Sequence, residues 1–75
     1  MPNGIAYIVA EYVKTPGGVF SMVRISVTDF GSSTNRTYFC HDSLKEFLRH
    51  VDYLDNYYTD LGYKVHRSCS ISISR

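Results

Sequence analysis

The segment SLKEFLRHVDYLDNYYTDLG, residues 43–62, decides the fold. Its apolar residues recur at spacings of three and four, which is the period of an amphipathic helix. Ser43 and Glu46 form the pattern of an N-terminal capping box, and Gly62 stands where a left-handed residue commonly closes a helix. The segment therefore predicts one helix over residues 44–61. Its buried stripe is expected to consist of Leu44, Phe47, Leu48, Val51, Leu54, Tyr58 and Leu61.

Three strands are predicted before this helix and one after it, because apolar residues alternate along these segments. Thr15-Pro16-Gly17-Gly18 is typical of a tight turn between the first two strands, since proline and glycine supply the two central backbone angles. Residues 31–35 are expected to form a flexible loop. The predicted strands are Ile5–Lys14, Val19–Phe30, Arg36–His41 and Tyr63–Ser74.

The element order βββαβ predicts a two-layer α+β domain that spans residues 1–75, with a four-stranded, mostly antiparallel sheet and the amphipathic helix packed on one of its faces. The helix returns the chain, so the last strand is expected to run parallel to the third, and a right-handed crossover places it beside the first. This gives the strand order 3-2-1-4. The first strand is apolar on both faces, which suits an internal position or a face that a partner covers.

Composition narrows the class of protein. The chain has 75 residues, a mass of 8.6 kDa and a formal net charge of +1, and 44% of its residues are hydrophobic. This allows one small core, whose margin of stability dimerisation would increase. Apolar stretches such as Ile5–Ala10 are too short to cross a membrane, and the start lacks the pattern of a signal peptide. We expect a cytoplasmic protein with no membrane association.

The two cysteines, Cys40 and Cys69, agree with a reducing compartment, because a secreted domain of this size usually carries more. Both are expected to be buried thiols, and a disulfide between them remains an alternative. His50 is expected on the solvent side of the helix.

Catalytic chemistry is not indicated. Cys40, His41 and Asp42 combine a nucleophile, a base and an acid, but neighbours on a strand point to opposite faces. The histidines and cysteines lack the spacing of a structural zinc site. No phosphate-binding glycine loop is present. We therefore predict no metal, no cofactor and no enzymatic activity.

The most informative surface is the acidic part of the helix, DYLDNYYTD, residues 52–60. Tyrosine is enriched at protein interfaces, and an acidic helix with interleaved tyrosines can dock on a basic surface. By analogy of size and composition, we expect a phage or mobile-element inhibitor of the anti-CRISPR or anti-restriction type. It would occlude a basic or nucleic-acid-binding surface of a host protein. The expected contact residues are Asp52, Tyr53, Asp55, Asn56, Tyr57 and Asp60.

Two other functions remain open. The chain could be a nucleic-acid-binding domain that uses the basic and serine-rich last strand, with Lys64, His66, Arg67 and Arg75 as contacts. It could instead be a self-assembling structural subunit. The last strand is long and free of proline, so two copies could also pair at this sheet edge into a homodimer.

Overall fold

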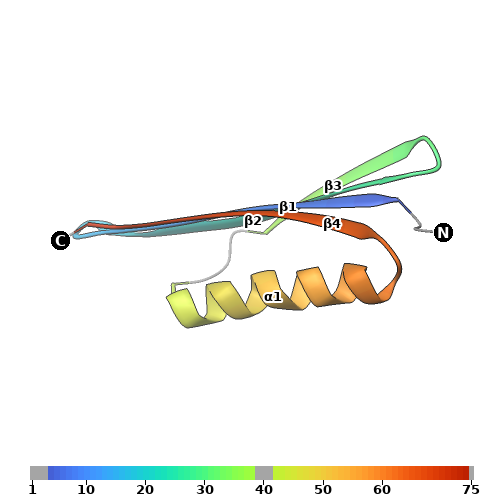
Figure 1. The fold of residues 1–75 in the computed structure, drawn as a ribbon. Coiled ribbons are helices and arrows are strands. Elements are labelled where there is room, and N and C mark those ends of the chain that lie inside the picture. The colour runs from blue at the N-terminus through green and yellow to red at the C-terminus, as the bar shows by residue number, and fades with distance from the viewer. Residues whose placement is uncertain (1–3, 39–41, 75) are drawn as a thin grey trace.

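The computed structural model describes residues 4–38 and 42–74. The described elements are β1 (Ile5–Thr15), β2 (Gly18–Asp29), β3 (Ser32–Tyr38), α1 (Leu44–Asp60) and β4 (Lys64–Ile73). The strands form one sheet in the order β3-β2-β1-β4, in which only the β1–β4 pair is parallel. Helix α1 lies against one face of this sheet (Figure 1). The predicted α+β class, element order and strand order are confirmed.

Both ends of α1 are capped as their residues predict. The Ser43 side-chain oxygen accepts a hydrogen bond from the amide three residues later, at 3.4 Å. At the other end Gly62 has a φ of +96°, a left-handed conformation that glycine adopts without strain. This turn directs the N–H groups of Gly62 and Tyr63 back to the carbonyls of Thr59 and Tyr58, each at 3.0 Å. The helix ends one residue earlier than predicted and turns sharply into β4.

The core lies between α1 and the inner face of the sheet. Alternate residues of β1 are buried there, and two of them, Ala6 and Ala10, are small enough to let the helix approach closely. Tyr12 is also buried, and its hydroxyl donates a hydrogen bond to the backbone carbonyl of Asp42 at 2.8 Å, which fixes the chain just before the helix. The core comprises Ala6, Ile8, Ala10, Tyr12, Val23, Ile25, Phe47, Val51 and Leu54.

The predicted loop over residues 31–35 is wrong, because β3 already begins at Ser32. A two-residue turn joins β2 to β3, and both of its residues, Phe30 and Gly31, have positive φ values of 47° and 84°. Such a turn matches the twist of a hairpin. The serine, threonine and asparagine residues of β3 do not alternate with apolar ones, because this edge strand is largely exposed. The sequence pattern therefore did not predict a strand here. Residues 39–41, the end of the predicted third strand, lie outside the described residues.

Three burial predictions on the helix side are also wrong. Leu61 is exposed, since it follows the last turn of α1 and lies beyond the core. His50 is half-buried, because its ring packs edge-on against Tyr38 of β3 with centroids 5.0 Å apart. Cys69 is exposed, together with Ile71 and Ile73 on the same face of β4.

Helix length explains the exposed end of β4. A helix of 17 residues is about 26 Å long, whereas the molecule extends over 46 Å. The sheet therefore projects past the first turn of α1 at the end where the chain terminates (Figure 1). Ile73, the last residue of β4, lies toward this projecting end, whereas Ile71 is paired with the buried Tyr12 and is exposed on the edge strand.

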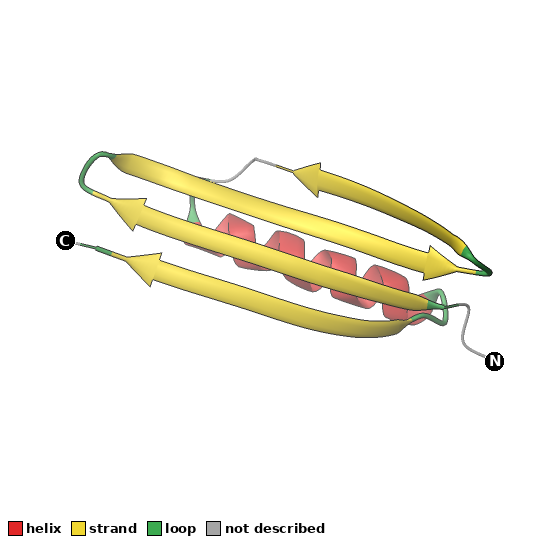
Figure 2. Ribbon diagram, turned by 90° about the horizontal axis from the view of Figure 1, so that it is seen from above, coloured by secondary structure: helices red, strands yellow, loops and turns green. Residues whose placement is uncertain are grey.

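The face of the sheet opposite α1 is called the open face here. Within the described residues no element packs on it (Figures 1 and 2). Tyr7, Val9 and Phe20 are exposed there. No helix among the described residues is both long enough and apolar enough to cross a membrane.

Candidate protein-binding surface on the helix

Two exposed tyrosines form the most distinctive feature of α1. Tyr53 and Tyr57 are 63% and 47% exposed, and their rings stack with centroids 6.1 Å apart and an interplanar angle of 23°. They are four residues apart, a spacing that places side chains side by side on one helix face. We call them the tyrosine pair. They form a large amphipathic patch whose two rings hold each other in place.

Further aromatic contacts tie the tyrosine pair to the sheet. The Tyr57 ring meets Tyr58 edge-on at 5.0 Å, and Tyr58 in turn meets Tyr63 at 5.5 Å. The Tyr63 hydroxyl donates a hydrogen bond to Asp29 Oδ2 at 3.1 Å, and this bond, with desolvation and the negative charge of Asp29, raises the pKa of Tyr63. A row of contacts thus runs from β2 to the outer surface of the helix. Tyr57 is thereby packed against side chains that are anchored to the sheet.

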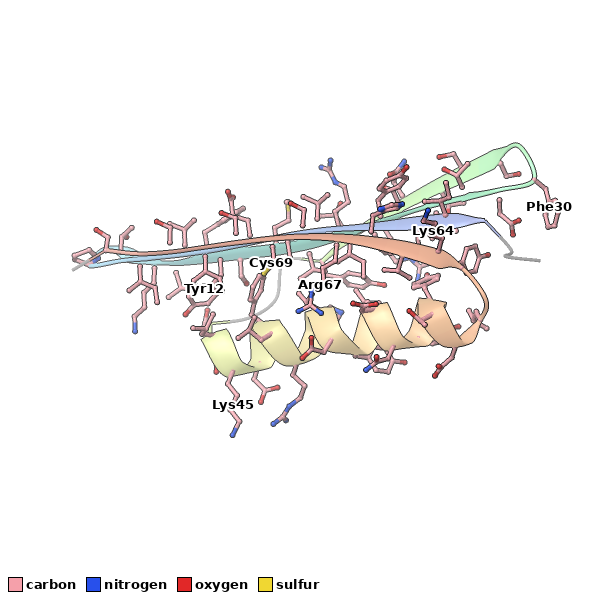
Figure 3. All side chains as sticks on the ribbon, viewed as in Figure 1. Tyr12, Phe30, Lys45, Lys64, Arg67 and Cys69 are labelled. Carbon is pink, nitrogen blue, oxygen red and sulfur yellow. The ribbon has the colours of Figure 1, made fainter. Side chains whose placement is uncertain are left out.

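The acidic residues of the predicted surface are not all free. Arg67 of β4 lies between the sheet and α1 (Figure 3), with Nη1 2.8 Å from Asp52 Oδ1 and 3.3 Å from Asp55 Oδ2. Desolvation lowers the pKa of Arg67, but hydrogen bonds and attraction from both carboxylates outweigh it, so the net pKa is raised. Asp55 also accepts a hydrogen bond from the Thr59 hydroxyl at 3.3 Å. One guanidinium therefore offsets part of the negative charge on this flank.

The predicted contact residues consequently fall into two groups. Asp55 was expected to face outward or flank the stripe, and it is half-buried at the contact with β4. Tyr53, Asn56, Tyr57 and Asp60 are exposed, as is Asp52 beside Arg67, which completes the set. The sequence pattern indicated the helical face. It did not indicate the pairing of Arg67, which lies seven residues after Asp60, the last residue of α1, and meets the helix because the chain reverses direction into β4.

A hollow beside Tyr58 was not predicted. It has a volume of about 210 Å³ and lies under the β2–β3 side of the sheet, next to the helix. The side-chain hydrogen bond with Tyr38 raises the pKa of Arg36, one of the lining residues. The register of β2 with β3 was needed to find this hollow, and the sequence did not reveal that register. It is lined by Ile25, Val27, Thr34, Asn35, Arg36 and Tyr58.

The residues of the predicted nucleic-acid surface do not share one face. His66 stacks on Tyr7 of β1 with ring centroids 5.2 Å apart and an interplanar angle of 18°, and Lys64 lies on the same open face. Arg67 points to the opposite side, toward α1 (Figure 3). Arg75 lies outside the described residues. The structure adds Tyr7 to this patch through a cross-strand pairing that the sequence left unidentified.

The candidate metal ligands and the two cysteines lie partly within the described residues. Among residues 4–38 and 42–74, no three histidine, cysteine, aspartate or glutamate side chains gather as metal ligands would. Cys40 and His41 lie outside the described residues. Cys69 is a free, exposed thiol, so the expectation of a buried thiol is wrong there, because β4 is an edge strand with no described strand on its outer side.

Comparisons with protein-family models, curated proteins and solved structures found no match.

Proposed function

We propose that this protein is a non-enzymatic protein-binding module whose contact surface is centred on the tyrosine pair, Tyr53 and Tyr57. The observation that carries the proposal is their exposed, mutually stacked arrangement on α1. Tyrosine is among the residues that contribute most to protein–protein binding, since it combines a rigid apolar ring with a hydroxyl. Rings that are already ordered lose less conformational entropy when a partner binds.

The partner is proposed to present a basic surface. Asp52 and Asp60 are exposed on the helix that carries the tyrosine pair, and Arg67 offsets part of the charge at Asp52. Complementary charge speeds association and disfavours other partners. Basic surfaces commonly bind nucleic acid, so occupation of one would make this protein an inhibitor, of the type that phages and mobile elements direct at host effectors. The hollow beside Tyr58 offers a place for a partner side chain.

The first experiment compares variants of one helix. Immobilised wild-type protein, Tyr53→Ala, Tyr57→Ala and the control Lys45→Ala are exposed to a bacterial lysate, and captured proteins are identified and quantified. Lys45 is exposed on the same helix but points away from the sheet at its opposite end (Figure 3). Either tyrosine variant should reduce capture of a specific protein by roughly tenfold or more, the effect of an interface hot spot. Lys45→Ala should leave capture unchanged.

The role of charge is tested at Asp60, because Asp52 and Asp55 both form ion pairs with Arg67. Asp60→Lys should weaken binding of the captured protein, and added salt should weaken wild-type binding. Added nucleic acid should compete with this protein for the purified partner. Equal capture by all variants, each folded by circular dichroism, would remove the helix surface from consideration.

A second candidate function is supported by the stacked pair of Tyr7 and His66 on the open face. Exposed aromatic rings on a sheet can stack on unpaired bases, and Lys64 beside them can contact a phosphate. This function predicts binding to a single-stranded oligonucleotide that falls steeply with salt and is weakened by Tyr7→Ala. Tyr53→Ala should leave such binding unchanged, so the two candidates are separable.

A further inference from the structure

The outer edge of β4 offers unpaired backbone groups in a defined pattern. The Lys64 N–H donates to the Gly4 carbonyl at 3.0 Å, and the Ser74 N–H donates to the Lys14 carbonyl at 2.8 Å. Even-numbered residues of β4 therefore direct their N–H and C=O groups toward β1, and odd-numbered ones direct theirs outward. No described segment lies beside this edge (Figure 2). The outward residues are Val65, Arg67, Cys69, Ile71 and Ile73.

This edge lacks the features that keep sheet edges apart. The register of β4 with β1 is continuous over ten residue pairs, so no bulge twists the strand away. The strand contains no proline, and its lysine is its first residue. Its one arginine, Arg67, is held against the protein's own helix by Asp52 and Asp55. Natural proteins commonly protect an exposed edge by such residues or bulges, and their absence favours pairing with another strand.

We propose that two copies of this chain form a dimer by antiparallel pairing of their β4 strands about a twofold axis at Cys69. In this register Val65 lies opposite Ile73 of the second copy, and Arg67 lies opposite its Ile71. Every outward residue of β4 then lies opposite an outward residue of β4 in the second copy, and no two like charges are opposed. An axis at Arg67 would place two guanidinium groups directly opposite each other, which is unfavourable.

A second copy also covers apolar surface that the single chain exposes. Ile71 and Ile73 are 45% and 56% exposed near the C-terminal end of edge strand β4. Antiparallel pairing brings Ile73 beside Val65 of the second copy, which packs against that copy's core, and places Ile71 against the aliphatic part of its Arg67. The self-complementary order of side chains along β4 favours a second copy over a foreign strand. The proposal does not depend on the function of the tyrosine pair.

Sedimentation equilibrium of the full chain tests the dimer. The wild type should show twice the mass of 8.6 kDa at high concentration. Ile71→Pro removes an outward N–H in each copy, leaves the β1–β4 hydrogen bonds intact and should weaken association by about tenfold or more. Ile71→Val should retain the dimer, as should Ser33→Lys on the opposite sheet edge. Should Ile71→Pro fail to fold, Ile71→Lys tests the same contact by charge. A monomeric wild type, or a dimer that neither change weakens, overturns the proposal.

The native thiol tests the register. Opposed residues in a hydrogen-bonded antiparallel pair have Cα atoms about 5.5 Å apart, within the range that a disulfide spans. In a Cys40→Ser background, mild oxidation should link Cys69 to Cys69 of the second copy. The variant Ser70→Cys with Cys69→Ser, in the same Cys40→Ser background, should form the link more slowly. Position 70 lies opposite Ser68 of the second copy and not opposite itself. Faster linkage from position 70 than from position 69 would overturn the register.

Discussion

Replacement of Phe47 by alanine tests whether α1 holds the fold together. Phe47 is fully buried, and its ring packs against the buried Tyr12 with centroids 5.4 Å apart. Phe47, Val51 and Leu54 are the buried residues of the helix, and the partly buried Leu44, Leu48 and Tyr58 pack around the same core. The loss of one large ring should therefore destabilise the whole domain, since the other face of the sheet has no described element to support it.

The expected cost follows from burial. Removal of a buried phenylalanine side chain destabilises a protein by about 3–5 kcal/mol, because apolar contacts are lost and a cavity remains. A chain of 75 residues has a total stability of about 4–11 kcal/mol by the usual value per residue. Phe47→Ala should thus remove between about a quarter and all of the stability. Leu61→Ala should cost less than about 1 kcal/mol, because Leu61 is 45% exposed although it belongs to the same sequence pattern.

The measurement is urea unfolding followed by far-ultraviolet circular dichroism. Phe47→Leu, which retains part of the volume, supplies a measurable value if the alanine variant does not fold. The order of unfolding midpoints should be wild type, then Leu61→Ala close to it, then Phe47→Leu, then Phe47→Ala. Equal shifts for Phe47→Ala and Leu61→Ala would show that α1 does not pack on the sheet as described.

Three further predictions concern the ends and flanks of the helix. Gly62→Ala should lower the free energy of unfolding by about 1–2 kcal/mol, because an alanine is strained at a φ of +96°, whereas Gly17→Ala, at a position without positive φ, should have little effect in the same thermal melts. The hydrogen bond to Asp29 raises the pKa of Tyr63, so its stabilising effect is complete below the unfolded value of about 10 and is lost as the pH rises further. The stability difference between wild type and Tyr63→Phe should therefore shrink above that pH, and a constant difference would contradict this assignment. A double-mutant cycle with Arg67→Gln and Asp52→Asn should give a coupling of about 0.2–1 kcal/mol that decreases with added salt, and a coupling insensitive to salt would argue against an exposed ion pair.

The strand order and the helix were predictable because several independent signals agreed. The stripe from Leu44 to Tyr58, the cap at Ser43 and the glycine at position 62 all indicated the same helix. The doubly apolar first strand required an internal position, and a right-handed crossover then left one arrangement. Agreement between local and global preferences of this kind is what makes a fold readable from sequence.

The errors arose where burial depends on length and on distant pairing. Periodicity places Ile73 on the inner face of β4, but it cannot show that the helix stops short of that residue. Ser32 and its neighbours carry no apolar alternation, because an exposed edge strand does not need it. The pairing of Arg67 with Asp52 joins elements whose relative position follows only from the crossover. Each missed feature is a property of the assembled layers rather than of a local segment.

The tyrosine pair on α1 and the outer edge of β4 are separate surfaces, so partner binding and dimerisation can be tested independently. A twofold axis perpendicular to the sheet at Cys69 places both helices on the same side, so a dimer presents two tyrosine pairs to one partner assembly. If the partner is also multivalent, Ile71→Pro should reduce both dimerisation and apparent affinity, because linked sites bind with an increased effective concentration. If each helix binds independently, Ile71→Pro should weaken the dimer and leave unchanged the amount of partner protein captured through Tyr53 and Tyr57. Tyr53→Ala should in either case leave the dimer intact, since its side chain lies on the helix and away from β4.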